Sequence, residues 1–290
     1  MIKHLFSFVK FSHTIFAMPF AVTSFFYAWH DMQTNEFPWR VLLLIVLCMV
    51  FARNAAMGFN RYIDRKYDKK NLRTRNREIP AGIISPKTAL VFVIVNGLLF
   101  CVTTMFINAL AFRLSFVALF TVLGYSYTKR FTALCHFILG IALGIAPAGA
   151  YIALTGELAP VAMLLSLLVL FWVGGFDILY ALPDCDFDRE NRLHSVPAAA
   201  GVKNAVILSA AIHVIPAATA LLIGFLFDRG LFYWAGCAVF IGLLIYQHAI
   251  VSPTNPNRHS AAFGLMNGIA SVGYAVFSIT DVLLTMNYEL

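Results

Sequence analysis

Residues 39–71 read WRVLLLIVLCMVFARNAAMGFNRYIDRKYDKKN, and this stretch decides the fold. Its first part, residues 39–58, is a predominantly apolar run of the length that an α-helix needs to cross a bilayer, about 20 residues. Its second part is polar and places two acids four residues apart, at Asp64 and Asp68. Residues four apart lie on one face of an α-helix. The stretch therefore predicts a membrane-spanning helix that leaves the bilayer with an acidic face.

The whole chain shares this apolar character. Of its 290 residues, 60% are hydrophobic and only 12% are charged, and the mean hydropathy is +0.79, whereas a soluble domain is about 25% charged. Apolar runs recur along the chain, at residues 13–29, 39–58, 88–111, 114–128, 134–154, 159–182, 205–226, 231–251 and 262–285. We expect an all-α, polytopic membrane protein, a single domain over residues 1–290 with nine transmembrane helices around a central cavity.

The formal charge of +7 is compatible with nucleic-acid binding, but its distribution argues against that partner. Lysines and arginines are concentrated in alternate loops, with nine between residues 61 and 87, while the opposite loops hold only Arg40, Arg113 and Arg229. The positive-inside rule then predicts a cytoplasmic N terminus and a C terminus outside, in a membrane that we expect to be a bacterial inner membrane. The five cysteines contain no Cys-x-x-Cys pair and predict neither a disulfide framework nor a zinc site.

A second polar run repeats the pattern of the first. Residues 177–191 read DILYALPDCDFDREN, and this run also follows an apolar helix directly. The shared pattern is two aspartates four apart and an asparagine three residues later: Asp64, Asp68 and Asn71 in the first run, and Asp184, Asp188 and Asn191 in the second. The repetition suggests an internal duplication, in which the helices over 39–58 and 159–182 are equivalent.

Helical geometry extends the first run into the membrane. An α-helix turns about 100° per residue, so Asn60, Asp64 and Asp68 fall within about 80° of one another. Arg53 shares that face about two turns deeper. A buried arginine needs an anion or a water-filled cavity beside it. Arg53 is therefore expected either to bind a substrate anion or to form an internal ion pair with Asp64 or Asp177.

The second run is predicted to behave likewise, with one interruption. On a continuous helix, Asp177, Tyr180, Asp184 and Asp188 would lie within an arc of about 80°. Pro183 should kink or end the helix between Asp177 and Asp184, because proline lacks the N–H group that helix continuation needs. That bend would aim the later carboxylates inward.

Carboxylates four apart repel each other, so a positive charge is expected between them. Magnesium takes oxygen ligands and is usually held by one or two carboxylates plus substrate phosphates. Two facing clusters of this kind predict a Mg²⁺-dependent diphosphate site. The alternative is that the acids only pair with nearby basic residues, such as Arg61, Arg65, Lys66, Arg189 and Arg192. The matched spacing of two clusters on one predicted side favours the functional interpretation.

The two aspartate motifs, Asn60-x3-Asp64-x3-Asp68 and Asp184-x3-Asp188, resemble the signature motifs of the UbiA superfamily of intramembrane aromatic prenyltransferases. Residues 73–77 (RTRNR) resemble the family's basic segment, although Glu78 falls where a proline often follows. Residues 125–131 (YSYTKRF) resemble its Tyr-Pro-x-x-Lys-Arg stretch, with Ser126 replacing the proline. Residues 11–20 and 53–57 resemble the 4-hydroxybenzoate polyprenyltransferase branch. That branch makes quinone precursors and includes relatives that act on 1,4-dihydroxy-6-naphthoate in menaquinone biosynthesis.

The resemblance and the residue chemistry together define a candidate site. Asp64, Asp68, Asp177, Asp184 and Asp188 are the expected catalytic acids. Four of these, all but Asp177, are the expected magnesium ligands together with Asn60. Substrate binding is assigned to a further set of residues: Asn60, Arg53, Arg73, Arg77, Lys129, Tyr125 and Tyr180. Tyr246 is a further candidate to shield a carbocation, since aromatic faces attract cations. His136, by contrast, is expected to be structural or interfacial.

These observations predict transfer of a polyprenyl group from its diphosphate to an aromatic acid in quinone biosynthesis. The prenyl tail would lie among apolar helices, open sideways to lipid. A transporter with an intramembrane acidic site is the rival from another class, and an internal repeat would suit it. A transporter does not explain why the acids gather at helix ends on one side with a four-residue step.

Overall fold

The computed structural model describes residues 17–251 and 260–288, and every regular element in these ranges is helical. The long helices are α2 (Met18–Asp31), α3 (Trp39–Lys70), α4 (Pro86–Met105), α5 (Ala109–Thr128), α6 (Cys135–Thr155), α7 (Pro160–Tyr180), α10 (Val202–Leu226), α11 (Leu231–Ile250) and α12 (Ser260–Tyr288). Between α7 and α10 lie three short elements, the 3₁₀ turn η2 (Leu182–Asp184) and the helices α8 (Cys185–Glu190) and α9 (Val196–Ala200).

Eight of the described helices, α3 to α7 and α10 to α12, are long and apolar enough to cross a membrane. This confirms the all-α, polytopic prediction. The remaining predicted span, residues 13–29, corresponds to α2, which has 14 residues, and the start of that span lies outside the described residues. All five cysteines are free, as expected.

The break between the third and fourth predicted spans was placed too late in the chain. The sequence predicted it near residue 112, but α4 ends at Met105 and α5 begins at Ala109. Asn108 explains the position, because its side-chain oxygen accepts a hydrogen bond from the Ala111 backbone N–H at 2.8 Å and caps α5. Its amide nitrogen also donates to the Ile152 carbonyl of α6 at 2.8 Å. A polar residue inside an apolar run therefore starts one helix and ties it to another.

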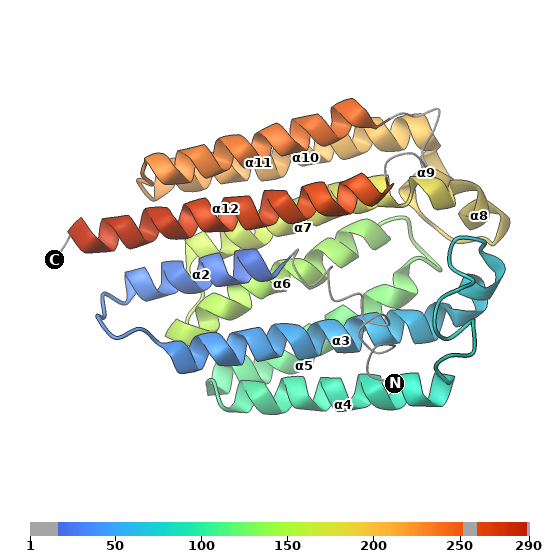
Figure 1. Ribbon diagram of the computed structural model, residues 1–290, viewed down its shortest axis with the longest axis horizontal. Coiled ribbons are helices and arrows are strands. Elements are labelled where there is room, and N and C mark those ends of the chain that lie inside the picture. The colour runs from blue at the N-terminus through green and yellow to red at the C-terminus, as the bar shows by residue number, and fades with distance from the viewer. Residues whose placement is uncertain (1–16, 252–259, 289–290) are drawn as a thin grey trace.

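The long helices lie side by side along the length of the molecule (Figure 1). The α6 and α7 helices approach each other closely because Gly140 has no side chain, since a Cβ there would lie 2.2 Å from the Leu170 carbonyl oxygen. The core contains a cluster of fully buried aromatic side chains, in which Phe20 packs against Trp172 at 5.3 Å and Tyr274 at 5.4 Å between ring centroids. This apolar packing holds the helix ends in fixed relation to one another.

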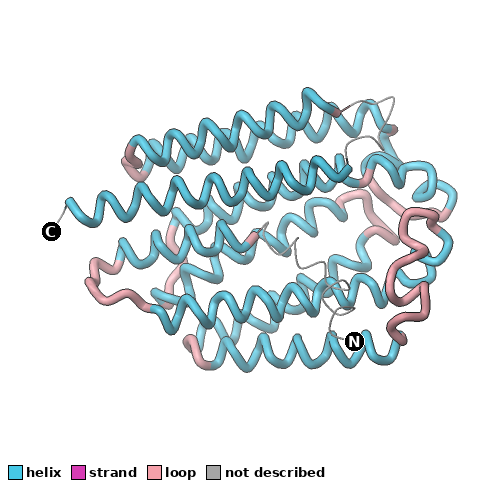
Figure 2. The backbone as a smooth tube through the Cα atoms, viewed as in Figure 1, coloured by secondary structure: helices cyan, strands magenta, loops and turns pink. Residues whose placement is uncertain are grey.

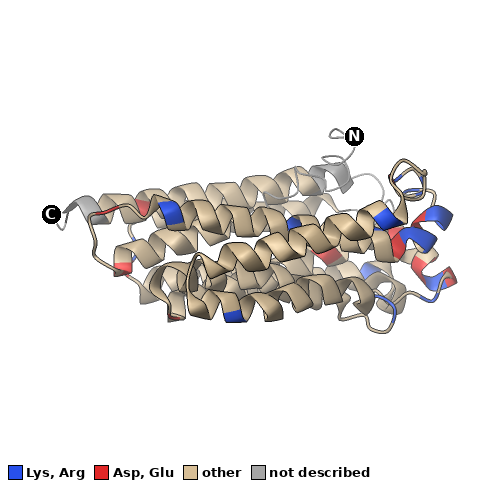
Figure 3. Ribbon diagram, turned by 90° about the horizontal axis from the view of Figure 1, so that it is seen from below, with Lys and Arg blue, Asp and Glu red and all other residues tan. Residues whose placement is uncertain are grey.

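The segment after α3 and the α8 and α9 helices meet at one end of the bundle (Figures 1 and 2). Charged residues also gather at that end, while the long middle of the bundle holds few of them (Figure 3). The two polar runs found in the sequence are thus brought together in space. The sequence prediction that they face each other is consistent with this arrangement.

The two runs differ in local structure. The first lies on one unbroken helix, because α3 continues for 32 residues and includes Asn60, Asp64 and Asp68. The second is broken, since α7 ends at Tyr180 and Pro183 lies in the 3₁₀ turn that follows. Pro183 therefore acts as predicted, but the shared helical face of Asp177 and Asp188 does not exist. Their positions are instead set by the bend.

Candidate active site

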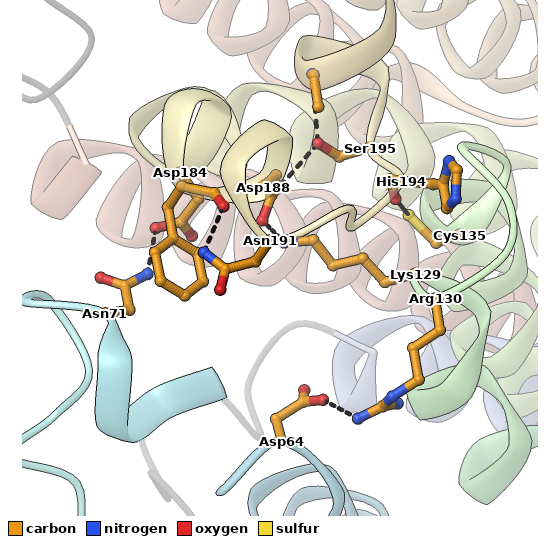
Figure 4. Close-up of polar contacts among 12 residues, drawn as sticks. Asp64, Asn71, Lys129, Arg130, Cys135, Asp184, Asp188, Asn191, His194 and Ser195 are labelled. Carbon is orange, nitrogen blue, oxygen red and sulfur yellow. Dashed lines mark hydrogen bonds and ion pairs between the residues drawn. The ribbon is translucent and has the colours of Figure 1, made fainter. Parts of the chain in front are cut away.

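The first motif faces a cavity of about 310 Å³ at the polar end of the bundle. The Asn60 side chain donates to Asp64 at 3.1 Å, one helical turn away on α3. Arg130, just past the end of α5, donates to the other oxygen of Asp64 at 2.8 Å (Figure 4). Arg77, from the segment after α3, binds Asp68 at 2.8 Å. Each acid of the first motif is therefore paired with an arginine from another segment.

The second motif is paired in the same way. Arg73 forms a two-pronged ion pair with Asp184, and Asn71 donates to the same carboxylate at 3.1 Å. Asp188 is fully buried and binds the Lys129 ammonium at 2.9 Å and the Ser195 hydroxyl at 2.7 Å (Figure 4). Burial alone would lower the pKa of Lys129, but Asp188 outweighs it and the net direction is upward, so Lys129 stays a cation.

The partners of these four acids are not the basic residues that the alternative interpretation named. Arg61 lies 3.6 Å from Glu78, Arg65 donates to the Tyr62 carbonyl, and Arg189 donates to the Ala198 carbonyl. The cations that do pair with the motif acids are Arg73, Arg77, Lys129 and Arg130. Three of these were selected from the sequence as substrate-binding residues. Acids and cations thus alternate in one cavity. A metal ion could take the place of the cations beside the acids, and a polyanion could take the place of the acids beside the cations.

The donor atoms at this end suit magnesium. They are carboxylate and amide oxygens, and the buried Oδ2 of Asp68 has no hydrogen-bond partner among the described residues. Within the described ranges, no three His, Cys, Asp or Glu side chains lie close enough to form a complete metal cage. Magnesium is commonly held by one or two carboxylates, with substrate phosphates completing its shell. The residues therefore fit a metal that arrives with a diphosphate better than a permanent structural ion.

Asp177 is different from the other four acids, because its partner is a histidine. His136, in the first turn of α6, contacts the Asp177 carboxylate at 2.7 Å through Nδ1. Both side chains line the same cavity as the motif acids. Tyr180, one turn further along α7, lies under the Arg73 guanidinium at 5.6 Å. The expectation that His136 is only structural or interfacial did not anticipate this contact.

Arg53 lies deeper, and the structure leaves it without an acidic partner among the described residues. Asp64 is taken by Arg130 and Asp177 by His136, so the predicted internal ion pair is absent. The Arg53 Nε atom is buried and has no hydrogen-bond partner in the described part of the chain. Arg53 and Tyr125 line both the polar cavity and a second cavity of about 390 Å³. That second cavity is mostly apolar and lies among α3, α4, α5 and α6.

All twelve residues selected from the sequence line the polar cavity: Arg53, Asn60, Asp64, Asp68, Arg73, Arg77, Tyr125, Lys129, Asp177, Tyr180, Asp184 and Asp188. Tyr246 is the exception among the weaker candidates, since it is 52% exposed on α11 and does not line the cavity. Sequence reasoning passed over Arg130, Asn71, His136 and Ser195. The first two stood inside quoted motifs, whereas His136 and Ser195 carry no local signal and are found only through their partners.

A membrane-embedded bundle with one charged cavity that adjoins an apolar one defines a site for a substrate with a polyanionic head and an apolar body. The chain belongs to the UbiA prenyltransferase family, whose sequence pattern matches residues 16–269. It is therefore a prenyltransferase and an integral membrane protein, which confirms the resemblance drawn from the motifs and favours the enzyme over the transporter interpretation.

Similar proteins support the same assignment. The chain is 34% identical over 237 residues to a 4-hydroxybenzoate octaprenyltransferase of Nitrosomonas europaea, covering 81% of this chain and 80% of that relative. A second 4-hydroxybenzoate octaprenyltransferase, from Thiobacillus denitrificans, is 34% identical over 233 residues. The match covers 78% of this chain and 76% of that relative.

Solved structures agree on the fold. A UbiA homologue from Aeropyrum pernix K1 superimposes with a TM-score of 0.82 at 27% identity, over 93% of this chain and 98% of that one. A UbiA homologue from Archaeoglobus fulgidus, determined with DMAPP and Mg²⁺, superimposes with a TM-score of 0.70 at 19% identity, over 95% of this chain and 99% of that one. At that identity the second likeness establishes the fold alone.

Proposed function

We propose that this chain transfers a polyprenyl group from a polyprenyl diphosphate to an aromatic acid of the 4-hydroxybenzoate type, as a magnesium-dependent step of ubiquinone or menaquinone biosynthesis. The observation that carries the proposal is Arg53, a half-buried side chain whose Nε is buried and which has no acidic partner among the described residues, where the charged cavity meets the apolar one. A carboxylate on an aromatic ring would match both its charge and its surroundings. The names of the relatives support this acceptor class.

The diphosphate of the donor would lie among the motif acids and their cations. When bound, magnesium would supply positive charge that neutralises the leaving group, held by Asn60 and by the acids Asp64, Asp68, Asp184 and Asp188. Arg73, Arg77 and Lys129 would then turn from their present acid partners to the phosphate oxygens. The Archaeoglobus fulgidus homologue was solved with DMAPP and Mg²⁺ bound, which supports a donor of this kind.

The prenyl tail would occupy the apolar cavity. Its lining includes many small side chains, such as Ala118, Ala142, Ala146 and Gly149, which leave room between α5 and α6. Because the tail would reach the cavity from the bilayer, whose chains are equally apolar, its position would be fixed by close packing against these walls and not by removal from water. The tail would therefore anchor the donor, and the reacting carbon would lie near the junction of the two cavities.

The reaction can be written with its bonds and charges balanced. The bond between the prenyl carbon and the diphosphate oxygen breaks, and its electron pair leaves with the diphosphate. The allylic cation that remains is attacked by a ring carbon beside the acceptor hydroxyl, and loss of the proton on that carbon restores aromaticity. Tyr125 and Tyr180 would face the cation with their π systems. The segments 61–87 and 189–204 are the candidate lids that exclude water, which would otherwise capture the cation.

The orientation in the membrane follows from the same proposal. Most basic residues would lie on the cytoplasmic side, with the N terminus cytoplasmic and the C terminus outside a bacterial inner membrane. The internal duplication remains a prediction of the sequence, with α3 and α7 as the equivalent helices.

The test is acceptor kinetics with the purified protein, Mg²⁺, a polyprenyl diphosphate and a panel that includes 4-hydroxybenzoate, 1,4-dihydroxy-6-naphthoate and phenol. Arg53→Gln should raise the KM for the preferred acid by roughly 10- to 100-fold, the value of one or two hydrogen bonds to a charged group. The KM for the donor should not change. Arg40→Gln, in the first turn of the same helix, is the matched control.

Two results would count against the proposal. If the wild-type protein prenylates no aromatic acid in the panel, the acceptor class is wrong. If Arg53→Gln raises the KM values of donor and acceptor equally, or if phenol is as good a substrate as its carboxylated counterpart, Arg53 does not bind the acceptor carboxylate.

A further inference from the structure

Among the five acids selected for the site, Asp177 is the one whose partner is neither a lysine nor an arginine. Asp64, Asp68, Asp184 and Asp188 each pair with a lysine or an arginine, which remain cations at any physiological pH. Asp177 pairs instead with His136, whose side chain is only 2% exposed, while the Asp177 side chain is 24% exposed at the cavity. This acid is therefore held in place by a hydrogen bond and keeps access to a bound substrate.

The hydrogen bonds of His136 determine which ring nitrogen carries the proton. The backbone N–H of Val196 donates to His136 Nε2 at 3.3 Å, so Nε2 must be an acceptor. The proton then lies on Nδ1, which donates to Asp177 Oδ2 at 2.7 Å. A proton on Nε2 would oppose the Val196 N–H group. The backbone therefore selects the tautomer in which His136 donates to Asp177.

The segment that presents Val196 is itself fixed by the second motif. Ser195 donates its hydroxyl to Asp188 at 2.7 Å, and Leu193 N–H donates to the Asp188 carbonyl at 2.8 Å. Ser195 is fully buried, and its hydroxyl also caps α9 by accepting from Ala198 N–H at 3.4 Å. A continuous series of contacts thus runs from Asp188, at the donor side, through Ser195, Val196 and His136 to Asp177.

We propose that His136 is a positioning residue that orients the Asp177 carboxylate to accept the proton that the acceptor ring loses. This inference rests on the proposed function. In the last step, the electron pair of the ring C–H bond returns to the ring and the proton passes to an Asp177 oxygen, which gives a neutral carboxylic acid. His136 keeps its own proton on Nδ1 throughout. The acceptor carboxylate at Arg53 and the ring proton at Asp177 would then be bound from two sides of one cavity.

A double-mutant cycle tests this role. His136→Leu should lower kcat by about 10- to 100-fold, the usual range for a residue that orients an active-site ligand. In an Asp177→Asn background the same substitution should change kcat by less than about twofold, because a residue that acts only through Asp177 has nothing left to position. His194→Leu is the matched control, since this histidine lies in the segment that presents Val196 and its side chain is exposed.

Two further measurements separate positioning from folding. The first is binding of the prenyl diphosphate with Mg²⁺ by calorimetry, which should be unchanged in His136→Leu. The second is the kinetic isotope effect on kcat with ring-deuterated acceptor, which should increase in His136→Leu because proton removal becomes slower. His136→Asn, whose amide can still donate to Asp177, should recover most of the lost rate.

The outcomes are distinguishable from failure of the proposed function. A wild-type protein that prenylates no aromatic acid overturns the proposed function itself. The role of His136 alone is overturned by a different result. The wild-type protein is then active, the losses in kcat from His136→Leu and Asp177→Asn multiply in the double variant, and the isotope effect does not change. Loss of diphosphate binding in both His136→Leu and His136→Asn also overturns it, since the residue would then support the fold of the donor site.

Discussion

The two acidic runs reach the same cavity by opposite structural means. The first is straight, with Asp64 and Asp68 on successive turns of α3, and its geometry follows from helical periodicity alone. The second is bent, with Asp177 on α7 and Asp184 and Asp188 beyond the helix end, in η2 and α8. The straight run holds its acids on one face of a single helix, whereas the bend distributes its acids over three successive elements.

One acid of each run differs sharply in burial. The side chain of Asp64 in the straight run is 29% exposed, whereas that of Asp188 in the bent run is 1% exposed. Lys129 and Arg130 are consecutive residues, yet Lys129 binds Asp188 and Arg130 binds Asp64. The two runs are therefore joined through a third segment, and Asp188 depends more strongly on its partners than Asp64 does, because water cannot replace them at Asp188.

The largest expected effect breaks the bent run at its first metal-site acid. Asp184→Asn should lower kcat by about 10²- to 10³-fold, comparable to the loss of one group that stabilises charge in a transition state. Asp186→Asn, two residues further along, should leave kcat nearly unchanged, because Asp186 is exposed and does not line the cavity. Steady-state kinetics of prenyl transfer measures both. Full magnesium-dependent turnover in Asp184→Asn would show that Asp184 has no role in catalysis.

Much of this arrangement could be predicted from the sequence, because it depends on local periodicity. The spacing of Asp64 and Asp68 fixes their helical face, and Pro183 fixes where α7 stops. The partner of each acid could not be predicted, because ion pairs such as Arg130 with Asp64 join residues 66 positions apart. The tautomer of His136 depends on a backbone N–H 60 residues away. Such contacts arise only when helix packing has fixed the distances.

A smaller effect compares how each run tolerates the loss of its cation. Lys129→Met should destabilise the metal-free protein by about 3 kcal/mol, since it leaves the buried charge of Asp188 uncompensated. Arg130→Met should cost no more than about 1 kcal/mol, because Asp64 retains Asn60 and access to water. Thermal unfolding in detergent measures the difference, with Lys87→Met, an exposed lysine on α4, as the control. Equal losses of unfolding free energy in the two variants would show that the burial of Asp188 does not make it more dependent on its cation than Asp64 is.

The smallest effect concerns the bend itself. Pro183→Ala restores a backbone donor and removes the ring clash with the Leu179 carbonyl, so α7 gains the option of another turn. Arg73 and Asn71 still bind Asp184, and Ser195 still binds Asp188, which limits the displacement of both acids. We therefore expect kcat to fall by no more than about tenfold, below the loss that a 1 Å misplacement can cause. Pro160→Ala, in the first turn of the same helix, should have no effect because proline is well tolerated there. Hydrogen exchange over residues 181–185 supplies the structural measurement.

If Pro183→Ala slows exchange there and abolishes activity, the proline alone makes the bend. If exchange and activity are unchanged, the bend is held by the ion pairs and hydrogen bonds of Asp184 and Asp188.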